Sequence, residues 1–139
     1  MTHAGNLSFA LPGGWSDMSR YQFLSADEEF SLEMDPGAPG PGGGLAGEID
    51  RYLAFVQEMG SASLRECGTV AVTGRESVFA RLELELGGGT PQIVRLLLIP
   101  ESPVRYLRVS LRGPLSRETE HETLWNRILP SLRLAEDDR

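Results

Sequence analysis

Apolar and polar residues alternate along most of this chain, which is the pattern of β-strands with one buried face. In residues 79–86, alanine and leucine at every second position share one side, and mostly charged residues share the other. Residues 92–99 are instead apolar on both sides, which is typical of a strand that is covered on both faces. The same kind of pattern predicts further strands over residues 7–11, 21–23, 30–34, 70–72 and 105–111. We therefore expect a mostly antiparallel sheet of about six or seven strands.

Two segments have the spacing of amphipathic helices. Residues 45–59 place apolar side chains three and four positions apart, and residues 116–129 do the same after an acid-rich first turn. Ser116 is the expected N-cap of the second helix. The stripe of the first helix comprises Leu45, Ile49, Tyr52, Leu53, Val56 and Met59. Strands and helices together predict the α+β class.

The chain is expected to form one domain. Its 139 residues suit one hydrophobic core, so we assign residues 1–139 to a single domain. Residues 35–44 are so rich in proline and glycine that they predict a loop. Residues 135–139 are expected to be a solvated, disordered tail.

One face of the predicted sheet is expected to be open, because two helices of this length can cover only one side. Leucine and valine at alternate positions of residues 82–86 and 107–111 are expected to face the helices. The opposite face would then be a mixed apolar and arginine-rich patch, which fits a protein-binding surface; a plain solvated surface with Arg–Glu pairs is the alternative. The candidate partner-binding residues are Phe79, Arg81, Gln92, Arg95, Leu97, Ile99, Tyr106 and Arg108.

Composition and charge exclude several classes of partner. The formal net charge is −7, which disfavours nucleic acid and anionic membranes as partners. The chain has one cysteine, Cys67, and two histidines, so neither a disulfide nor a metal cluster is expected, and we expect no cofactor. Residues 1–5 do not begin a signal peptide and no apolar run spans a bilayer, so a cytoplasmic protein without membrane insertion is expected.

Catalytic chemistry has little support in the sequence. Glu83 and Glu85 lie two positions apart on one strand face, about 7 Å by strand rise, which leaves a small carboxylate enzyme as a remote alternative. Alternating arginines make ion pairs the better explanation of these acids. His121 lies on an acidic helical turn and is expected to be exposed. We therefore expect no catalytic residue and no enzyme activity.

The opening stretch resembles the DcrB-like domain family, whose members begin with LP-x-GW-x-D-x-S/T-x-Y-x-F. The resemblance continues through the helix at 45–59 and the Gly74-Arg75 turn to the ending IL-x-SL-x-L after Trp125. The matching residues of the opening are Leu11, Pro12, Gly14, Trp15, Asp17, Ser19, Tyr21 and Phe23. This resemblance implies the PsbP-like α/β/α sandwich.

Stand-alone members of this size are similar to the Eag chaperones of type VI secretion systems. That resemblance implies a cytoplasmic homodimer whose partner is a secreted effector with apolar N-terminal helices, bound on the open sheet face. Those chaperones tend to carry a Gln-rich run on the middle strand, where this chain reads Gln92-Ile93-Val94-Arg95. A general protein–protein interaction or regulatory module of the same fold, without a chaperone role, is the alternative.

Overall fold

The structure is a computed structural model of the chain, and it describes residues 2–4, 7–9, 16–19, 22–40, 44–87 and 89–134. Only the backbone is described for residues 2–4, 7–9, 16–19, 133 and 134. Residues 11–15 of the opening motif, the predicted strand residue Tyr21 and the predicted tail at 135–139 lie outside the described residues.

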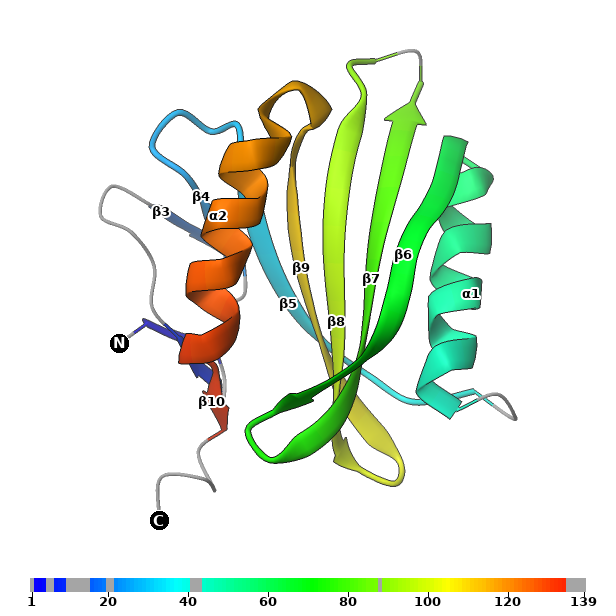
Figure 1. Cartoon of the computed structure of the whole chain (residues 1–139), viewed down its shortest axis with the longest axis vertical. Coiled ribbons are helices and arrows are strands. Elements are labelled where there is room, and N and C mark those ends of the chain that lie inside the picture. The colour runs from blue at the N-terminus through cyan, green and yellow to red at the C-terminus, as the bar shows by residue number, and fades with distance from the viewer. Residues whose placement is uncertain are drawn as a thin grey trace.

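A seven-stranded antiparallel sheet forms the centre of the molecule (Figure 1), in the order β3-β4-β5-β9-β8-β7-β6. A separate three-stranded sheet has the order β1-β2-β10. The strands are β1 (Thr2–Ala4), β2 (Leu7–Phe9), β3 (Ser16–Ser19), β4 (Gln22–Leu24), β5 (Ser31–Gly37), β6 (Gly60–Val72), β7 (Arg75–Leu86), β8 (Gln92–Ser102), β9 (Arg105–Pro114) and β10 (Arg133–Leu134). The helices are α1 (Gly44–Gln57) and α2 (Glu118–Ile128), and 3-10 turns at Leu115–Arg117 and Leu129–Ser131 flank α2. The predicted α+β class, antiparallel sheet and two main helices are confirmed.

The two helices lie on opposite faces of the large sheet, so the prediction that both cover one face is wrong. On one face, α1 packs through Ile49 and Val56 on the even-numbered residues of β7 and β8. On the other face, α2 packs through Trp125 and Ile128 on β5, β9 and the odd-numbered residues of β8. The pattern of β8 requires this arrangement, because a strand that is apolar on both sides has to be covered on both sides.

The register between β8 and β9 decides which residues share a face. Arg95 pairs with Leu111 and Leu97 pairs with Val109, so the odd-numbered residues of both strands face α2. Side chains on paired positions point to the same side of a sheet. Tyr106 and Arg108 therefore face α1, and the predicted single open face is wrong.

The start of α2 differs from the prediction. The chain leaves β9 at Pro114, which cannot donate to the strand ladder, and makes a 3-10 turn before the helix begins at Glu118. Arg117, not Ser116, is the N-cap residue, and no side chain caps this end. Glu118 and Glu120 lie in the first turn, where the helix dipole favours acids.

A glycine allows β9 to pass close beneath α2. A Cβ atom on Gly113 would lie 2.4 Å from Cδ1 of Phe30 and 3.3 Å from Cδ2 of His121. Only a residue without a side chain fits this close approach. The position of β9 therefore sets how deeply His121 enters the layer between helix and sheet.

None of the helices in the described part of the chain is long and apolar enough to cross a membrane.

Candidate functional site: a groove between α2 and the β6–β7 hairpin

A groove of about 220 Å³ lies on the α2 face of the large sheet, between α2 and the hairpin of β6 and β7. In Figure 1, α2 lies in front of the side of the sheet that holds β5, and no helix lies in front of β7 and β6. We call this site the Arg95 groove. Its lining residues are Glu66, Val70, Phe79, Ala80, Arg81, Arg95, Glu122, Trp125, Asn126 and Leu129.

Apolar side chains from both walls form much of the groove. Val70 on β6 and Phe79 on β7 are half-buried and pack on the core beneath α2. Leu129 and Trp125 approach from the helix side, and Leu129 is also half-buried. Half-buried apolar side chains beside a hollow can be covered further by a bound partner.

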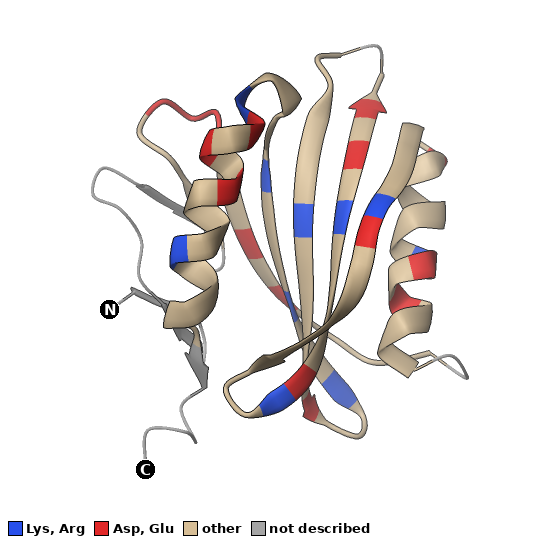
Figure 2. Ribbon diagram, viewed as in Figure 1, with Lys and Arg blue, Asp and Glu red and all other residues tan. Residues whose placement is uncertain are grey.

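Arginines from neighbouring strands lie across the sheet beside these apolar residues. Arg81 on β7 pairs directly with Arg95 on β8, and Figure 2 shows basic bands on the adjacent strands β8, β7 and β6. Arg81 is surrounded by acids, since its guanidinium lies 2.7 Å from Glu118 and 3.9 Å from both Glu66 and Glu83. The charge of Arg81 is therefore compensated within the chain.

Arg95 has a neutral partner instead. Its Nη1 donates to Nδ1 of His121 at 2.5 Å, and Nε2 of His121 donates to the carbonyl of Leu111 at 2.6 Å. His121 is therefore the neutral Nε2–H tautomer, because Nδ1 has to accept from a guanidinium. Among the described residues, Arg95 makes no ion pair with a carboxylate. Burial lowers the pKa of Arg95, although the side chain stays charged, and the largest opposing effect is the negative charge of Glu122.

His121 is fully buried, with 0% of its surface exposed, so the predicted exposed histidine is wrong. Burial, together with the positive charge of Arg95, lowers the pKa of His121 to about 4, against the raising effect of its hydrogen bond to the Leu111 carbonyl. Both ring nitrogens are occupied by protein groups. His121 thus fixes α2 to β8 and β9 and is not available as a general base.

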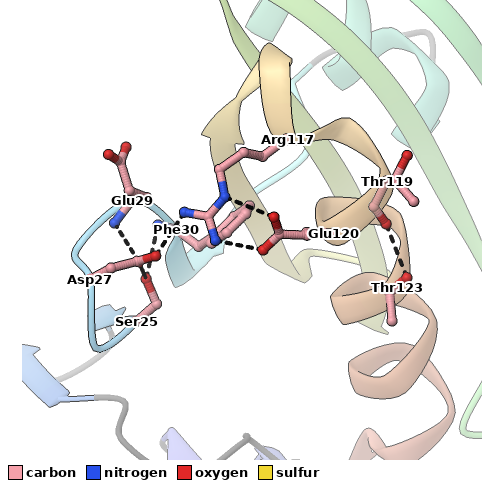
Figure 3. A network of polar contacts seen from close by, with 8 residues as sticks. All are labelled: Ser25, Asp27, Glu29, Phe30, Arg117, Thr119, Glu120 and Thr123. Atoms are coloured by element: carbon pink, nitrogen blue, oxygen red, sulfur yellow. Dashed lines mark hydrogen bonds and ion pairs between the residues drawn. The ribbon is translucent and has the colours of Figure 1, made fainter.

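A second, more open cleft of about 440 Å³ lies on the other side of α2, beside the β4–β5 turn. Arg117 bridges this cleft with its Nη1 2.7 Å from Asp27 and its Nε and Nη2 3.1 and 2.5 Å from the two oxygens of Glu120 (Figure 3). Ser25 and the backbone N–H of Glu29 also donate to Asp27, at 2.7 and 3.1 Å.

The polar groups of this second cleft satisfy one another. Hydrogen bonds from Ser25 and Arg117 lower the pKa of Asp27 to about 2, and hydrogen bonds to Glu120 and Asp27 raise the pKa of Arg117. The guanidinium carbon of Arg117 also lies 4.5 Å from the centre of the Phe30 ring. This network ties the β4–β5 turn to the start of α2, which is a structural role.

The eight residues predicted from the sequence to share one face are divided by the structure. Phe79, Arg81 and Arg95 line the Arg95 groove. Leu97 and Ile99 lie on the same sheet face but are fully buried beneath α2. The other three lie on the α1 face: Gln92, Tyr106 and Arg108.

Two of the residues on the α1 face have partners there. The Tyr106 hydroxyl donates to Glu48 at 3.2 Å, and Arg108 lies 3.2 Å from Asp35. The Arg108 guanidinium also lies 5.6 Å from the centre of the Tyr52 ring. These contacts hold α1 and β5 against β9, so the Tyr106 and Arg108 side chains act within the fold.

Sequence reasoning missed the helix side of the groove. The spacing of His121, Trp125 and Leu129 places them on one side of a helix, but Trp125 and Leu129 were expected only to pack the core. Val70 was expected to be an ordinary strand residue. Only the packing of α2 next to the β6–β7 hairpin brings these positions together.

Metal binding and carboxylate catalysis gain no support from the geometry. Within the described residues, no three acidic, histidine or cysteine side chains are placed to hold a metal ion. Glu83 lies 3.2 Å from Arg65 and 3.9 Å from Arg81, and Glu85 is exposed. Cys67 is exposed on β6.

The fold is similar to that of several solved structures, although the sequences have diverged far. No family model matches the sequence, and no similar protein was found among curated proteins. LpqN, involved in cell envelope biogenesis of Mycobacterium tuberculosis, has a TM-score of 0.67 at 10% identity, covering 92% of this chain and 82% of LpqN. Cyanobacterial PsbP (CyanoP) from Synechocystis sp. PCC 6803 has a TM-score of 0.66 at 13% identity, covering 93% and 86%.

A third structure comes from a eukaryote. The Ran-binding protein Mog1p of Saccharomyces cerevisiae has a TM-score of 0.67 at 11% identity, covering 94% of this chain and 91% of Mog1p. Identities this low show a shared fold and nothing more. The three likenesses extend over most of both chains in each comparison. The chain therefore has the PsbP/Mog1-like fold.

Proposed function

We propose that this protein is a non-enzymatic binding module that holds a segment of another protein in the Arg95 groove. The observation that carries the proposal is the groove itself, where half-buried Phe79, Val70 and Leu129 lie beside charged residues. Its volume of about 220 Å³ is below the roughly 300–1,000 Å³ of typical small-molecule sites. A hollow of this size suits one or two side chains of a protein partner better than a whole cofactor.

In its finer form, we propose a DcrB-like chaperone or adaptor. It would act in the cytoplasm as a homodimer and bind the apolar N-terminal segment of a secreted type VI effector. The support is the resemblance of the opening, central and closing motifs to that family, together with the apolar lining of the groove. A client segment along the groove would cover Phe79, Val70 and Leu129, and polar groups at the rim would pair with its polar atoms.

The alternative is a regulatory module for a folded partner. The charged rim favours it, because Glu66, Arg81 and Glu122 would form ion pairs with a polar partner surface. Mog1p has the same fold and is a Ran-binding protein, which also supports a regulatory module. Binding through the rim would weaken strongly with salt, whereas binding through the apolar lining would not.

The groove can be blocked without disturbing the core. Asn126 is exposed and lies at the rim, so Asn126→Trp should fill the groove and leave the fold intact. Thr123→Trp is the matched control, because Thr123 is exposed on the same helix but lines the second cleft. We expect co-expression with type VI effectors that carry apolar N-terminal helices to yield a complex, with at least a tenfold lower yield for Asn126→Trp and an unchanged yield for Thr123→Trp. Equal loss in both variants, or no complex with such effectors, would contradict the chaperone form of the proposal.

A further inference from the structure

We propose that the Arg95 groove selects a partner segment in which an acidic side chain follows an apolar one, and that Arg95 receives the carboxylate. This inference rests on the proposed function and specifies the chemistry of the partner. The carboxylate would lie against the guanidinium at the sheet side of the groove. The apolar neighbour would lie on Phe79, Val70 and Leu129.

The first argument is the incomplete pairing of Arg95. A guanidinium has five N–H donors in a fixed planar fork. The Arg95 contact that the structure gives is the single bond to Nδ1 of His121, which is a neutral acceptor. The Arg95 side chain is only partly buried. In the described part of the chain, the buried polar atoms that lack a hydrogen-bond partner do not include any Arg95 nitrogen. Its remaining donors therefore reach the groove, where a ligand can accept from them.

The neighbouring charges determine which anion fits. Glu118 and Glu66 lie around Arg81, and Glu122 lies at the groove rim as an exposed carboxylate. These acids offset much of the positive charge of Arg81 and Arg95, so the groove lacks the excess of positive charge that a doubly charged phosphate needs. The planar guanidinium fork also matches the geometry of a carboxylate. A carboxylate of a single negative charge is thus the anion that this site favours.

The size and lining of the groove determine what carries the carboxylate. A volume of about 220 Å³ equals that of roughly seven water molecules in the liquid, which is enough for a glutamate and part of an apolar side chain. Burial lowers the pKa of Arg95, which means that its charge is incompletely solvated in the free protein. A carboxylate that binds in the groove would give the Arg95 guanidinium a charged partner and form a charge-assisted hydrogen bond with it.

The test compares two peptides that differ only in charge. Acetyl-Leu-Glu-Leu-amide and acetyl-Leu-Gln-Leu-amide are titrated into the whole protein, and NMR follows the side-chain N–H of Arg95 and the indole N–H of Trp125. We expect the glutamate peptide to bind about tenfold more tightly, as for one charge-assisted hydrogen bond in a partly solvated site. Arg95→Gln should abolish this preference. Arg112→Gln is the control, because Arg112 is exposed and faces the α1 side, so the preference should persist.

A measurement on the unmodified protein guards against a folding defect in Arg95→Gln. Raising the NaCl concentration should reduce the preference for the glutamate peptide, because a partly exposed ion pair is screened. Equal binding of both peptides, or a preference that survives in Arg95→Gln, would overturn the inference while leaving apolar binding, and hence the proposed function, intact. Butyrate binding at Arg95 as tightly as the glutamate peptide would assign the site to small organic acids and overturn the partner segment. Binding of neither peptide would contradict both the inference and the proposed groove function.

Discussion

His121 joins three parts of the fold through two hydrogen bonds. It lies on α2, accepts from Arg95 on β8 and donates to the carbonyl of Leu111 on β9. A buried polar side chain with both ring nitrogens paired is well tolerated, whereas its protonated form would place a second positive charge beside Arg95. The neutral state of His121 is thus a condition for the packing of α2 and for the orientation of Arg95 in the groove.

Protonation of His121 should destabilise the folded protein. Its pKa is lowered from 6.5 to about 4 on folding, so between these values the unfolded state binds more protons than the folded state. The unfolding free energy should therefore rise with pH from about 4 to about 6.5, by on the order of 3 kcal/mol, and this contribution should be complete above pH 6.5. Urea unfolding at a series of pH values measures it.

The matched variant for this experiment is His121→Gln, which cannot titrate. The pH dependence that remains in the variant comes from groups that both proteins share, so the difference between the two curves reports His121. Asp27 contributes mainly below the pH range of His121, because its pKa is lowered from 3.8 to about 2 and its contribution is lost as the pH falls between these two values. Identical slopes in the two proteins would show that His121 is not the source.

At the scale of elements, α1 has one buried and one exposed side. The predicted stripe is confirmed for Ile49 and Val56, which are buried, and for Leu45, Tyr52 and Leu53, which are half-buried and pack on the same cluster. It is wrong for Met59, which is 50% exposed, because the helix ends at Gln57 and the chain turns into β6 at Gly60.

Substitutions on the two sides of α1 should differ sharply in cost. Ile49 is buried, so Ile49→Ala should lower the unfolding free energy by about 2–4 kcal/mol, from lost apolar burial and the cavity left behind. Phe55 is 60% exposed, so Phe55→Ala should change it by less than about 0.5 kcal/mol. Guanidinium unfolding of both variants measures this difference, and similar losses would contradict the orientation of α1.

At the scale of the whole molecule, two apolar layers enclose the large sheet. One layer lies between α1 and the sheet and the other between α2 and the sheet. Strands β8 and β9 take part in both layers and have a neighbour on each side, whereas β6 is an edge strand of the sheet. An extra residue at Arg65 interrupts the pairing of β6 with β7 and bends this edge, which discourages pairing with another chain.

Amide exchange should therefore be slowest in β8 and β9. Among the strands β6, β7, β8 and β9, it should be fastest along β6. Backbone amides of central strands exchange only when the whole domain unfolds, whereas outward amides of an edge strand have no strand partner. On β6, amides that face β7 should exchange more slowly than those that face outward. Hydrogen exchange followed by NMR tests this order, and uniform protection along β6 would indicate that another chain covers this edge.

The sequence by itself determined the α+β class, the two helices and the alternation within each strand, because these depend on spacing along the chain. It also indicated that β8 is covered on both faces. It did not determine which residues of neighbouring strands lie on the same face of the sheet. In the β8–β9 hairpin, Ser102 pairs with Arg105, but an extra residue at Glu101 shifts the register before Pro100 pairs with Tyr106.

Without that bulge, Arg95 would lie opposite Arg112, and Tyr106 and Arg108 would share a face with Arg95 and Leu97 as the sequence predicted. A shift of one residue moves every side chain of a strand to the other face of the sheet, so this local feature decided which residues meet. The Arg95 groove also depends on the packing of α2 beside the β6–β7 hairpin, and these two elements are far apart in the sequence. Only tertiary packing brings Trp125 and Leu129 into one groove with Phe79 and Arg95.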